Sequence, residues 1–133
     1  DIQKIEIELY QKRKIEKLIL VESNIDYSYK YFDRKFIENL TTALKPREEI
    51  LIIKKGFVTD TSFANVCFWD GQKWIAPDTP LLSGTKRQKL LDEKKIIEQT
   101  IRKEDIVNFE KVSLINGMLE LGDCIVNINQ LLS

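Results

Sequence analysis

The chain has 133 residues, and its 21 Lys and Arg residues balance its 21 Asp and Glu residues, so its formal net charge is zero. A chain of this length can bury one core, and a balanced charge creates no field that would favour nucleic acid or an anionic membrane as a partner. The chain contains no histidine, which excludes Ser-His-Asp and Cys-His catalysis and the usual zinc sites. Any proton transfer would therefore depend on lysine, carboxylate or tyrosine side chains.

The apolar runs and the cysteines indicate the cellular compartment in which we expect the protein. Runs such as Leu18 to Val21 and Ile50 to Ile53 have the length of strands, and the sequence shows neither a membrane span nor a signal peptide. Cys67 and Cys124 fit no metal or redox spacing and have apolar neighbours, as buried thiols do. We therefore expect a protein of the reducing cytoplasm, without a membrane or nucleic-acid partner.

The first part of the chain predicts strands separated by one helix. Alternating apolar residues over 2–10 and a denser apolar run over 15–21 predict two strands that pair as a hairpin. Apolar residues recur at helical spacing from about Asp33 to Leu44, and Lys45-Pro46 ends this helix. The run EILIIK, from Glu49 to Lys54, is typical of a buried strand.

The second part begins with a predicted hairpin. Residues 58–60 and 64–69 form extended runs, and Asp70-Gly71 is the dipeptide that supplies positive φ in a tight hairpin turn. Many strands with few helices predict an α+β fold with a curled sheet. The remaining predicted elements are a helix over 85–93, a short strand over 96–101, a helical turn over 103–109, and strands over 112–115 and 119–128 separated by the Asn116-Gly117 turn.

Three features could carry chemistry, and each also has a purely structural interpretation. Lys30 lies between Tyr29 and Tyr31; most lysines are solvated, but burial among tyrosines would lower the pKa of the amine, as a nucleophile or proton shuttle requires. Asp60 is either a functional acid or a turn former that bonds its local backbone. Gly84-Thr85 either begins an ordinary helix or leaves backbone N–H groups open to a phosphate.

The segment GFVTDTSFANVCFWDGQKWIAPDTPLLSGTKRQKLL resembles the signature of the class IV pyridoxal-phosphate enzymes. These are the branched-chain aminotransferases, the D-amino acid aminotransferases and the aminodeoxychorismate lyases. Their pattern runs G-x-V-T-E, S-x-N-[IVL]-F, a hairpin, T-P and L-L-x-G-[IV]-[TM]-R. SYKYFDR resembles the segment around the cofactor lysine, and VSLINGMLEL resembles a late strand and turn, so the resemblance covers about 27–121. The matching signature residues are Gly56, Val58, Thr59, Ser62, Asn65, Phe68, Pro80, Leu81, Leu82, Gly84 and Arg87.

The resemblance assigns the cofactor and its contacts. Lys30 would bind pyridoxal 5'-phosphate covalently as a Schiff base and would move the proton at the substrate carbon. Asp60 would face the pyridine nitrogen and hold its proton. Gly84, Thr85 and Lys86 would present backbone N–H groups to the phosphate at the start of the helix.

Further residues have secondary roles by the same resemblance. Asn116 and Gly117 would lie near the phosphate or the substrate. Asn65 is expected to brace the hairpin and Arg87 to anchor the helix, both structural roles.

Three departures from the family pattern bear on activity. Asp60 replaces a glutamate and is one methylene shorter, so it must approach the ring more closely. Lys86 replaces the usual threonine, and Gly117 replaces a small or hydroxyl residue, so hydroxyl groups that could hold the phosphate are missing.

The resemblance also implies an architecture. We expect residues 1–133 to form a single domain, the C-terminal pyridoxal-phosphate-binding portion, with the curled, barrel-like sheet and few helices of the large domain of the D-amino acid aminotransferase-like fold. The family's small N-terminal domain, which contributes a phosphate-binding arginine and part of the substrate pocket, has no counterpart here. Because the family completes its active site across a dimer interface, we expect a homodimer that acts on a small-molecule substrate.

Three functions remain open at this point. The favoured one is that of an aminodeoxychorismate lyase, which eliminates pyruvate from 4-amino-4-deoxychorismate to give 4-aminobenzoate for folate synthesis; Arg34, four positions after Lys30, and Asn116-Gly117 favour it. The second is a branched-chain or D-amino acid transaminase. The third is a non-catalytic relative that acts as a scaffold or binding module, which the three departures and the missing domain suggest.

Overall fold

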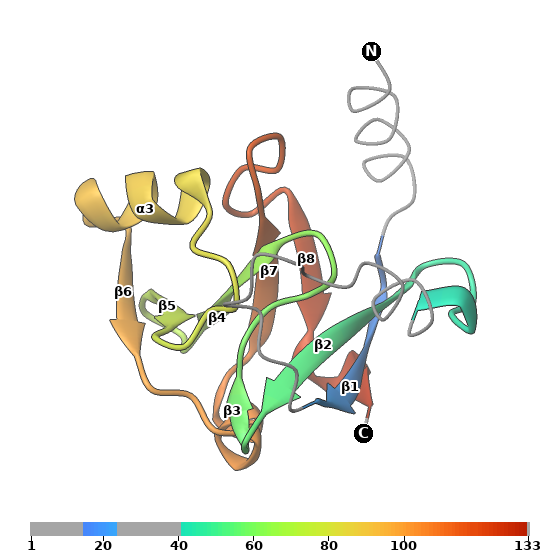
Figure 1. Cartoon of the computed structure of the whole chain (residues 1–133). Coiled ribbons are helices and arrows are strands. Elements are labelled where there is room, and N and C mark those ends of the chain that lie inside the picture. Colours follow the sequence, from blue (N-terminus) through green and yellow to red (C-terminus); the bar gives the residue numbers. More distant parts are fainter. Residues whose placement is uncertain (1–14, 24–40, 133) are drawn as a thin grey trace.

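The computed structural model describes residues 15–23 and 41–132, which form two β-sheets that pack against each other (Figure 1). The four-stranded sheet has the order β3-β2-β1-β9 and the five-stranded sheet the order β6-β5-β4-β7-β8. The first sheet consists of β1 (Lys17–Glu22), β2 (Glu48–Lys54), β3 (Phe57–Val58) and β9 (Leu131–Leu132). The second consists of β4 (Asn65–Trp69), β5 (Trp74–Pro77), β6 (Ile96–Gln99), β7 (Lys111–Ile115) and β8 (Cys124–Asn127). The helices are α3 (Thr85–Asp92), η1 (Lys103–Asn108) and η2 (Ile128–Gln130).

Strand β1 lies between β2 and β9 and is parallel to both. A parallel pair needs a long crossover, and residues 41 and 42, which are helical, lie in the connection from β1 to β2. They agree with the end of the predicted 33–44 helix, whose residues 33–40 lie outside the described residues. The predicted strand over 2–10 also lies outside them, so its hairpin with β1 stays a prediction.

The β4–β5 hairpin confirms the strongest local prediction. Its strands are antiparallel, with Trp69 opposite Trp74. Gly71 has a φ of 101°, which favours glycine, and Oδ1 of Asp70 accepts hydrogen bonds from the backbone N–H groups of Gln72 and Lys73, each at 2.8 Å. The turn residues therefore adopt the conformation for which the Asp-Gly dipeptide is suited.

Two of the other predictions for this half hold only in part. Of the extended run predicted over 58–60, only Val58 lies in a strand, β3. Helix α3, strands β6 and β7 and the helical turn η1 are confirmed, although β6 ends two residues early. The predicted strand over 119–128 is wrong in its first part, because residues 121–123 form a turn and β8 begins only at Cys124. Gly122 has a φ of 94° and the N–H of Asp123 bonds to the carbonyl of Glu120 at 3.0 Å, a geometry that no strand can contain.

The fold is a mixed α+β structure, as predicted. In the described part of the chain the two sheets do not close on each other, so the barrel-like closure stays unconfirmed. None of the helices in the same part has the length and apolar character needed to span a bilayer.

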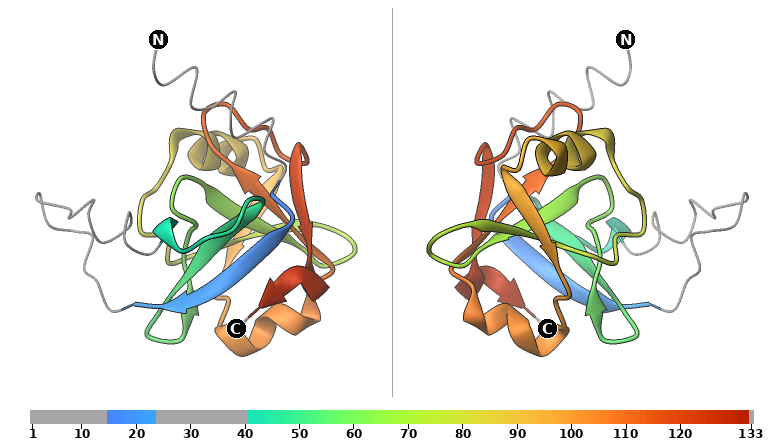
Figure 2. Two further views of the ribbon diagram at one scale, coloured as in Figure 1. Left: turned by 90° about the vertical axis from the view of Figure 1, so that its right-hand side faces the viewer. Right: turned by 90° about the vertical axis from the view of Figure 1, so that its left-hand side faces the viewer.

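The core follows the period of two along β4. Val66 and Phe68 point into the cluster between the two sheets, whereas Cys67, between them, packs with Leu90 of α3 on the opposite face. Burial raises the pKa of the Cys67 thiol to about 12, so this cysteine is an inert core residue, as predicted. The five-stranded sheet thus has one face on the first sheet and the other under α3, which the two views of Figure 2 show.

Replacing Phe68 by alanine is expected to lower the free energy of unfolding by about 3–5 kcal/mol, because the ring is fully buried and packs against Phe109 at 5.2 Å between ring centroids. Chemical denaturation would measure the change. The control Val107→Ala, at a residue that is 77% exposed, should change it by less than about 0.5 kcal/mol. Equal effects of the two variants would contradict this description of the core.

Candidate functional site

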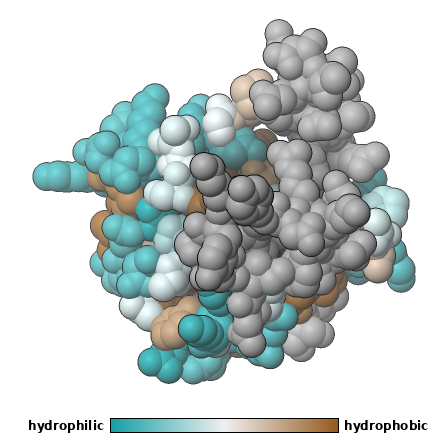
Figure 3. Space-filling view, viewed as in Figure 1, coloured by the Kyte–Doolittle hydropathy of each residue, from teal (hydrophilic) through white to brown (hydrophobic). Residues whose placement is uncertain are grey.

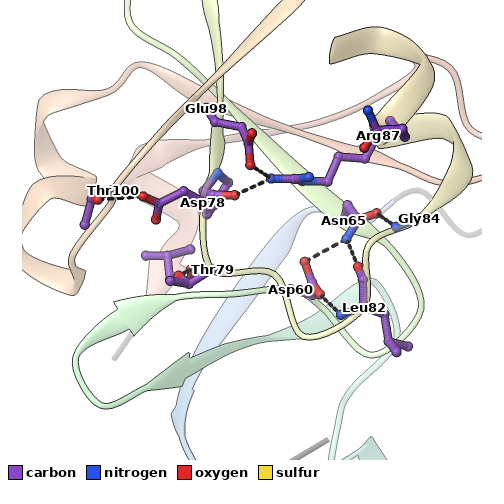
Figure 4. Close-up of polar contacts among 12 residues, drawn as sticks. Asp60, Asn65, Asp78, Thr79, Leu82, Gly84, Arg87, Glu98 and Thr100 are labelled. Carbon is purple, nitrogen blue, oxygen red and sulfur yellow. Dashed lines mark hydrogen bonds and ion pairs between the residues drawn. The ribbon is translucent and has the colours of Figure 1, made fainter. Parts of the chain in front are cut away.

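Asp60 is a buried carboxylate, 5% exposed, that follows β3. Its backbone carbonyl accepts a hydrogen bond from Ile52 of β2 at 2.8 Å, which fixes where the side chain starts. Oδ1 accepts a hydrogen bond from Nδ2 of Asn65 at 2.9 Å, and Oδ2 accepts two, from the N–H groups of Leu81 at 2.8 Å and Leu82 at 3.1 Å (Figure 4). The carboxylate of Asp60 therefore fixes the position of the 81–82 segment through its two backbone N–H groups.

Burial also sets the charge state of Asp60. Loss of hydration raises the pKa of this carboxyl from 3.8 to about 6, and the hydrogen bonds from Asn65 and the two leucine amides, together with the positive charge of Arg87, oppose the shift. Within the described residues no lysine or arginine forms an ion pair with it. At neutral pH Asp60 is thus an ionised carboxylate in an interior position.

Asn65, at the start of β4, joins the two segments that the sequence assigns to a cofactor. Its Nδ2 donates to Asp60 and to the carbonyl of Leu82 at 2.8 Å, and its Oδ1 accepts from the N–H of Gly84 at 3.2 Å. A Cβ atom at Gly84 would lie 2.5 Å from that Oδ1, so glycine is required by this close approach. The expected brace therefore connects the hairpin to the 81–84 segment.

The start of α3 has the character of an anion site. Its N-cap is Gly84, no side chain in the described residues caps it, and its first turn contains no acidic residue. The first intrahelical bond runs from Gln88 to the carbonyl of Gly84 at 3.1 Å, so the N–H groups of Thr85, Lys86 and Arg87 have no acceptor within the helix. They lie at the positive end of the helix dipole.

One predicted contact needs correction. The N–H of Gly84, which was expected to face a phosphate, donates to Asn65. The physical reason is the close approach described above, which brings the glycine amide onto the asparagine oxygen. The donors left to an anion are the amides of Thr85, Lys86 and Arg87.

Arg87 anchors α3, as the sequence indicated. Its buried guanidinium donates from Nη2 to the carbonyl of Pro77 in β5 at 2.9 Å and forms an ion pair with Glu98 of β6 (Figure 4). The helix is thereby tied to two strands of the sheet that it covers. The sequence offered no signal for either partner, because both are distant and one is a backbone carbonyl.

The turn after β7 reaches the same region. Oδ1 of Asn116 accepts from the N–H groups of Met118 at 2.8 Å and Leu119 at 2.9 Å, and its Nδ2 contacts the carbonyl of Phe63 at 3.5 Å. Gly117 is exposed, its φ is not positive, and a Cβ there would meet nothing within 4 Å, so neither packing nor backbone conformation requires glycine. Asn116 is a turn former whose amide lies near the segment that follows Asp60.

The structure therefore brings together Asp60, Asn65, Gly84, the first turn of α3 and the turn at Asn116. Lys86 completes this grouping, since its ammonium forms an ion pair with Glu120 of that turn. Lys30 and Arg34 lie outside the described residues, so the approach of Lys30 to Asp60 stays a prediction.

Glu49 is a residue of this region that the sequence reasoning missed. It is buried, and its Oε1 accepts hydrogen bonds from the N–H of Ile50 and from Oγ of Ser62, both at 2.8 Å. Burial raises the pKa of its carboxyl. The available signal was weak: Glu49 directly precedes the apolar run Ile50–Ile53 in β2, where a buried carboxylate is costly unless it has hydrogen-bond partners. Glu49 thus holds the segment that follows Asp60.

Comparison with known proteins decides the family. The model of the amino-transferase class IV family matches residues 28–124. The chain belongs to the class IV aminotransferase family. An uncharacterized protein of Haemophilus influenzae is 54% identical over 95 residues, which are 71% of this chain and 50% of that protein.

Two solved structures have the same fold as this chain. A structure from Haemophilus somnus, described as a "putative 4-amino-4-deoxychorismate lyase", has 43% identity and a TM-score of 0.70, and the match covers 82% of this chain and 56% of that one. A Mesorhizobium loti protein described as a "putative amino-acid aminotransferase" shares the fold, with 17% identity and a TM-score of 0.70 over 90% of this chain and 60% of that one. The chain thus spans between 50% and 60% of the length of these three proteins.

The residues of this site fit pyridoxal phosphate, the cofactor on which the family generally depends. A Mycobacterium tuberculosis structure with this fold is a pyridoxal-phosphate-bound form. Its identity to this chain is 12% and its TM-score 0.65, and the match covers 95% of this chain and 51% of that one. The start of α3 offers amides and no acidic side chain to a phosphate. Oδ1 of Asp60 accepts one hydrogen bond from the described residues and has capacity for a second, from a pyridinium N–H. The donor and acceptor set therefore matches both ends of the cofactor.

Replacing Asn65 by alanine is expected to lower the free energy of unfolding by about 2–4 kcal/mol, since it leaves the buried carboxylate of Asp60 and the partly buried N–H of Gly84 without their hydrogen bonds to Asn65. The N–H of Gly84 should also exchange with solvent faster in the variant. The control Asn129→Ala, at an exposed residue, should change the stability by less than about 0.5 kcal/mol. An unaltered exchange rate at Gly84 would contradict the bridging role.

The raised pKa of Asp60 predicts a dependence of stability on pH. Between pH 3.8 and 6 the unfolded chain has released the proton that the folded protein still holds, so the contribution of Asp60 to stability falls as pH rises through this window and is constant above it. The free energy of unfolding of the wild type, relative to Asp60→Asn, should therefore fall by up to about 3 kcal/mol between pH 3.5 and pH 7. Denaturation series at several pH values would measure it, and parallel profiles of the two proteins would refute the shifted pKa.

Proposed function

We propose that the protein is a pyridoxal-phosphate-dependent lyase that eliminates pyruvate from 4-amino-4-deoxychorismate and releases 4-aminobenzoate, a precursor for folate synthesis. The observation that carries the proposal is the hydrogen-bonded connection from the buried Asp60 through Asn65 to Gly84 at the start of α3. The relative from Haemophilus somnus, at 43% identity over 82% of this chain, supports the choice of reaction.

Each end of the site has a task in this reaction. When bound, pyridoxal phosphate supplies an electron sink for the negative charge that develops at the substrate carbon. Asp60, ionised at neutral pH and shielded from water, accepts a hydrogen bond from the protonated pyridine nitrogen and keeps the proton there. The backbone amides of Thr85 and Lys86 hold the phosphate, so the ring is oriented from two sides.

Lys30 carries the remaining task in the proposal. Lys30 would hold the cofactor, and its amine would act as the base that moves the proton at the substrate carbon. An elimination needs this single base and one substrate. The expected homodimer and the cytoplasmic location belong to the same proposal.

An assay with 4-amino-4-deoxychorismate tests the proposal. We expect the protein loaded with pyridoxal phosphate to release 4-aminobenzoate, and Lys30→Ala to abolish the release. Asp60→Asn should lower the rate by about 10–100-fold, because the ring nitrogen loses a charged partner worth about 1.5–3 kcal/mol. Asp60→Glu, which restores the family's usual acid, should retain more activity than Asp60→Asn, and Asp92→Asn at an exposed position of α3 is the matched control.

Two other outcomes would contradict the proposed lyase activity. Formation of glutamate from 2-oxoglutarate and a branched-chain or D-amino acid, without release of 4-aminobenzoate, would identify a transaminase. A colourless protein that takes up no pyridoxal phosphate at high concentration would identify a non-catalytic scaffold.

A further inference from the structure

We infer that the ammonium group of Lys86 binds the phosphate group of the cofactor. Without the cofactor, the same ammonium group pairs with Glu120, so a bound phosphate and Glu120 compete for it. The inference rests on the cofactor site of the proposed function and concerns a residue at which this chain departs from the family pattern. It assigns a purpose to a lysine that stands in the place of a hydroxyl side chain.

The first support is the position of Lys86. It is the second residue of α3, where the free amides of the first turn lie, and helical side chains lean toward the N-terminus of their helix. Its side chain is only 11% exposed, although it is a lysine on a helix whose surface is largely hydrophilic (Figure 3). An ammonium group at the positive end of a helix dipole is unfavourable unless an anion accompanies it.

The second support is that the carboxylate paired with Lys86 comes from a distant part of the chain. Oε1 of Glu120 lies 2.5 Å from Nζ of Lys86, across 34 positions of sequence. Glu120 belongs to the β7–β8 connection, which lies at the same end of the molecule as α3 in Figures 1 and 2. The contact therefore links the start of α3, which the resemblance assigns to the phosphate, with the connection that begins at Asn116, which it assigns to the phosphate or the substrate.

The third support is the balance of charge. Lys86, Lys89 and Lys95 all lower the pKa of the Glu120 carboxyl, and Lys86 does so most strongly, through its hydrogen bond. The first turn of α3 carries no acid of its own. Because Glu120 is a single charge with a side chain 63% exposed, a phosphate dianion at the adjacent amides can compete with it for Lys86.

This arrangement predicts that substitutions of Lys86 and of Glu120 change the affinity for phosphate-containing ligands in opposite directions. Removing Lys86 takes away a charged contact to the phosphate, whereas removing the charge of Glu120 frees Lys86 for it. A contact that only stabilised the fold would weaken ligand binding in both variants, and equally for ligands with and without a phosphate.

The experiment compares pyridoxal phosphate with pyridoxal, which lacks the phosphate, by spectroscopic titration of the intact protein. The readout is the ratio of the two dissociation constants, pyridoxal over pyridoxal phosphate. Lys86→Met should lower this ratio by about 10-fold, and Lys86→Thr, which restores the family's hydroxyl, should lower it less. Glu120→Gln should raise it severalfold, and Lys89→Met, one turn along the same helix, should change it by less than about 2-fold.

A ratio that is unchanged in Lys86→Met, or lowered in Glu120→Gln, would overturn the inference. Inorganic phosphate provides a second readout that needs no pyridoxal compound: it should raise the melting temperature of the wild type, raise that of Glu120→Gln by more, and leave that of Lys86→Met unaffected. If the wild type binds neither pyridoxal compound, the proposed function fails while the phosphate series still decides the role of Lys86; no stabilisation of the wild type by phosphate would then refute it.

Discussion

The side chain of Asn65 is the contact on which the candidate site depends. It is the point where three parts of the chain meet: the carboxylate after β3, the first residue of β4, and the segment that leads into α3. Its partners are the buried carboxylate of Asp60, the partly buried Gly84 and the carbonyl of the exposed Leu82. A buried polar group left without its hydrogen bond costs about 1–3 kcal/mol of folding free energy, and this penalty falls mainly on Asp60. This penalty, more than any single attraction, keeps Asp60 and Gly84 in a fixed relation.

Burial of Asp60 has two consequences that act in opposite directions. It destabilises the ionised form and raises the pKa, which costs folding free energy at neutral pH. The same removal of water strengthens any interaction that the carboxylate makes with a cationic partner. Three donated hydrogen bonds, two of them from backbone amides, keep the group ionised above pH 6 and hold it in one orientation. A carboxylate one methylene shorter than the family's glutamate is thus supported by the chain segment that passes over it.

Helix α3 is positioned by charge as much as by apolar packing. Only Arg87 and Leu90 are buried along it, which is a narrow contact for a helix of eight residues. Consecutive residues provide the rest: Arg87 pairs with Glu98 on the sheet beneath, and Lys86 pairs with Glu120 on the neighbouring turn. The two ion pairs lie on different sides of the first turn. The pair that the buried Arg87 forms with Glu98 fixes the first turn of α3, whose backbone amides follow the Asn65–Gly84 hydrogen bond.

The sequence by itself determined the elements whose cause is local. Asp70-Gly71 specifies the hairpin, and the segment from Gly56 to Leu91 identifies the family. It also pointed to Asp60 and to the start of α3. The strand predicted over 119–128 went wrong because its apolar residues were weighed above Gly122, whose positive φ ends any strand.

Only the tertiary structure decided which strands pair and which polar side chains contact one another. That β1 pairs with β2 and β9, that Asp60 receives the amides of Leu81 and Leu82, and that Lys86 meets Glu120 all depend on segments far apart in the sequence. A backbone amide has no residue-type signal, and a surface charge pattern does not say which opposite charge lies within 4 Å. These contacts follow from how the two sheets and α3 pack, because burial leaves each polar group only the partners that packing brings within hydrogen-bonding distance.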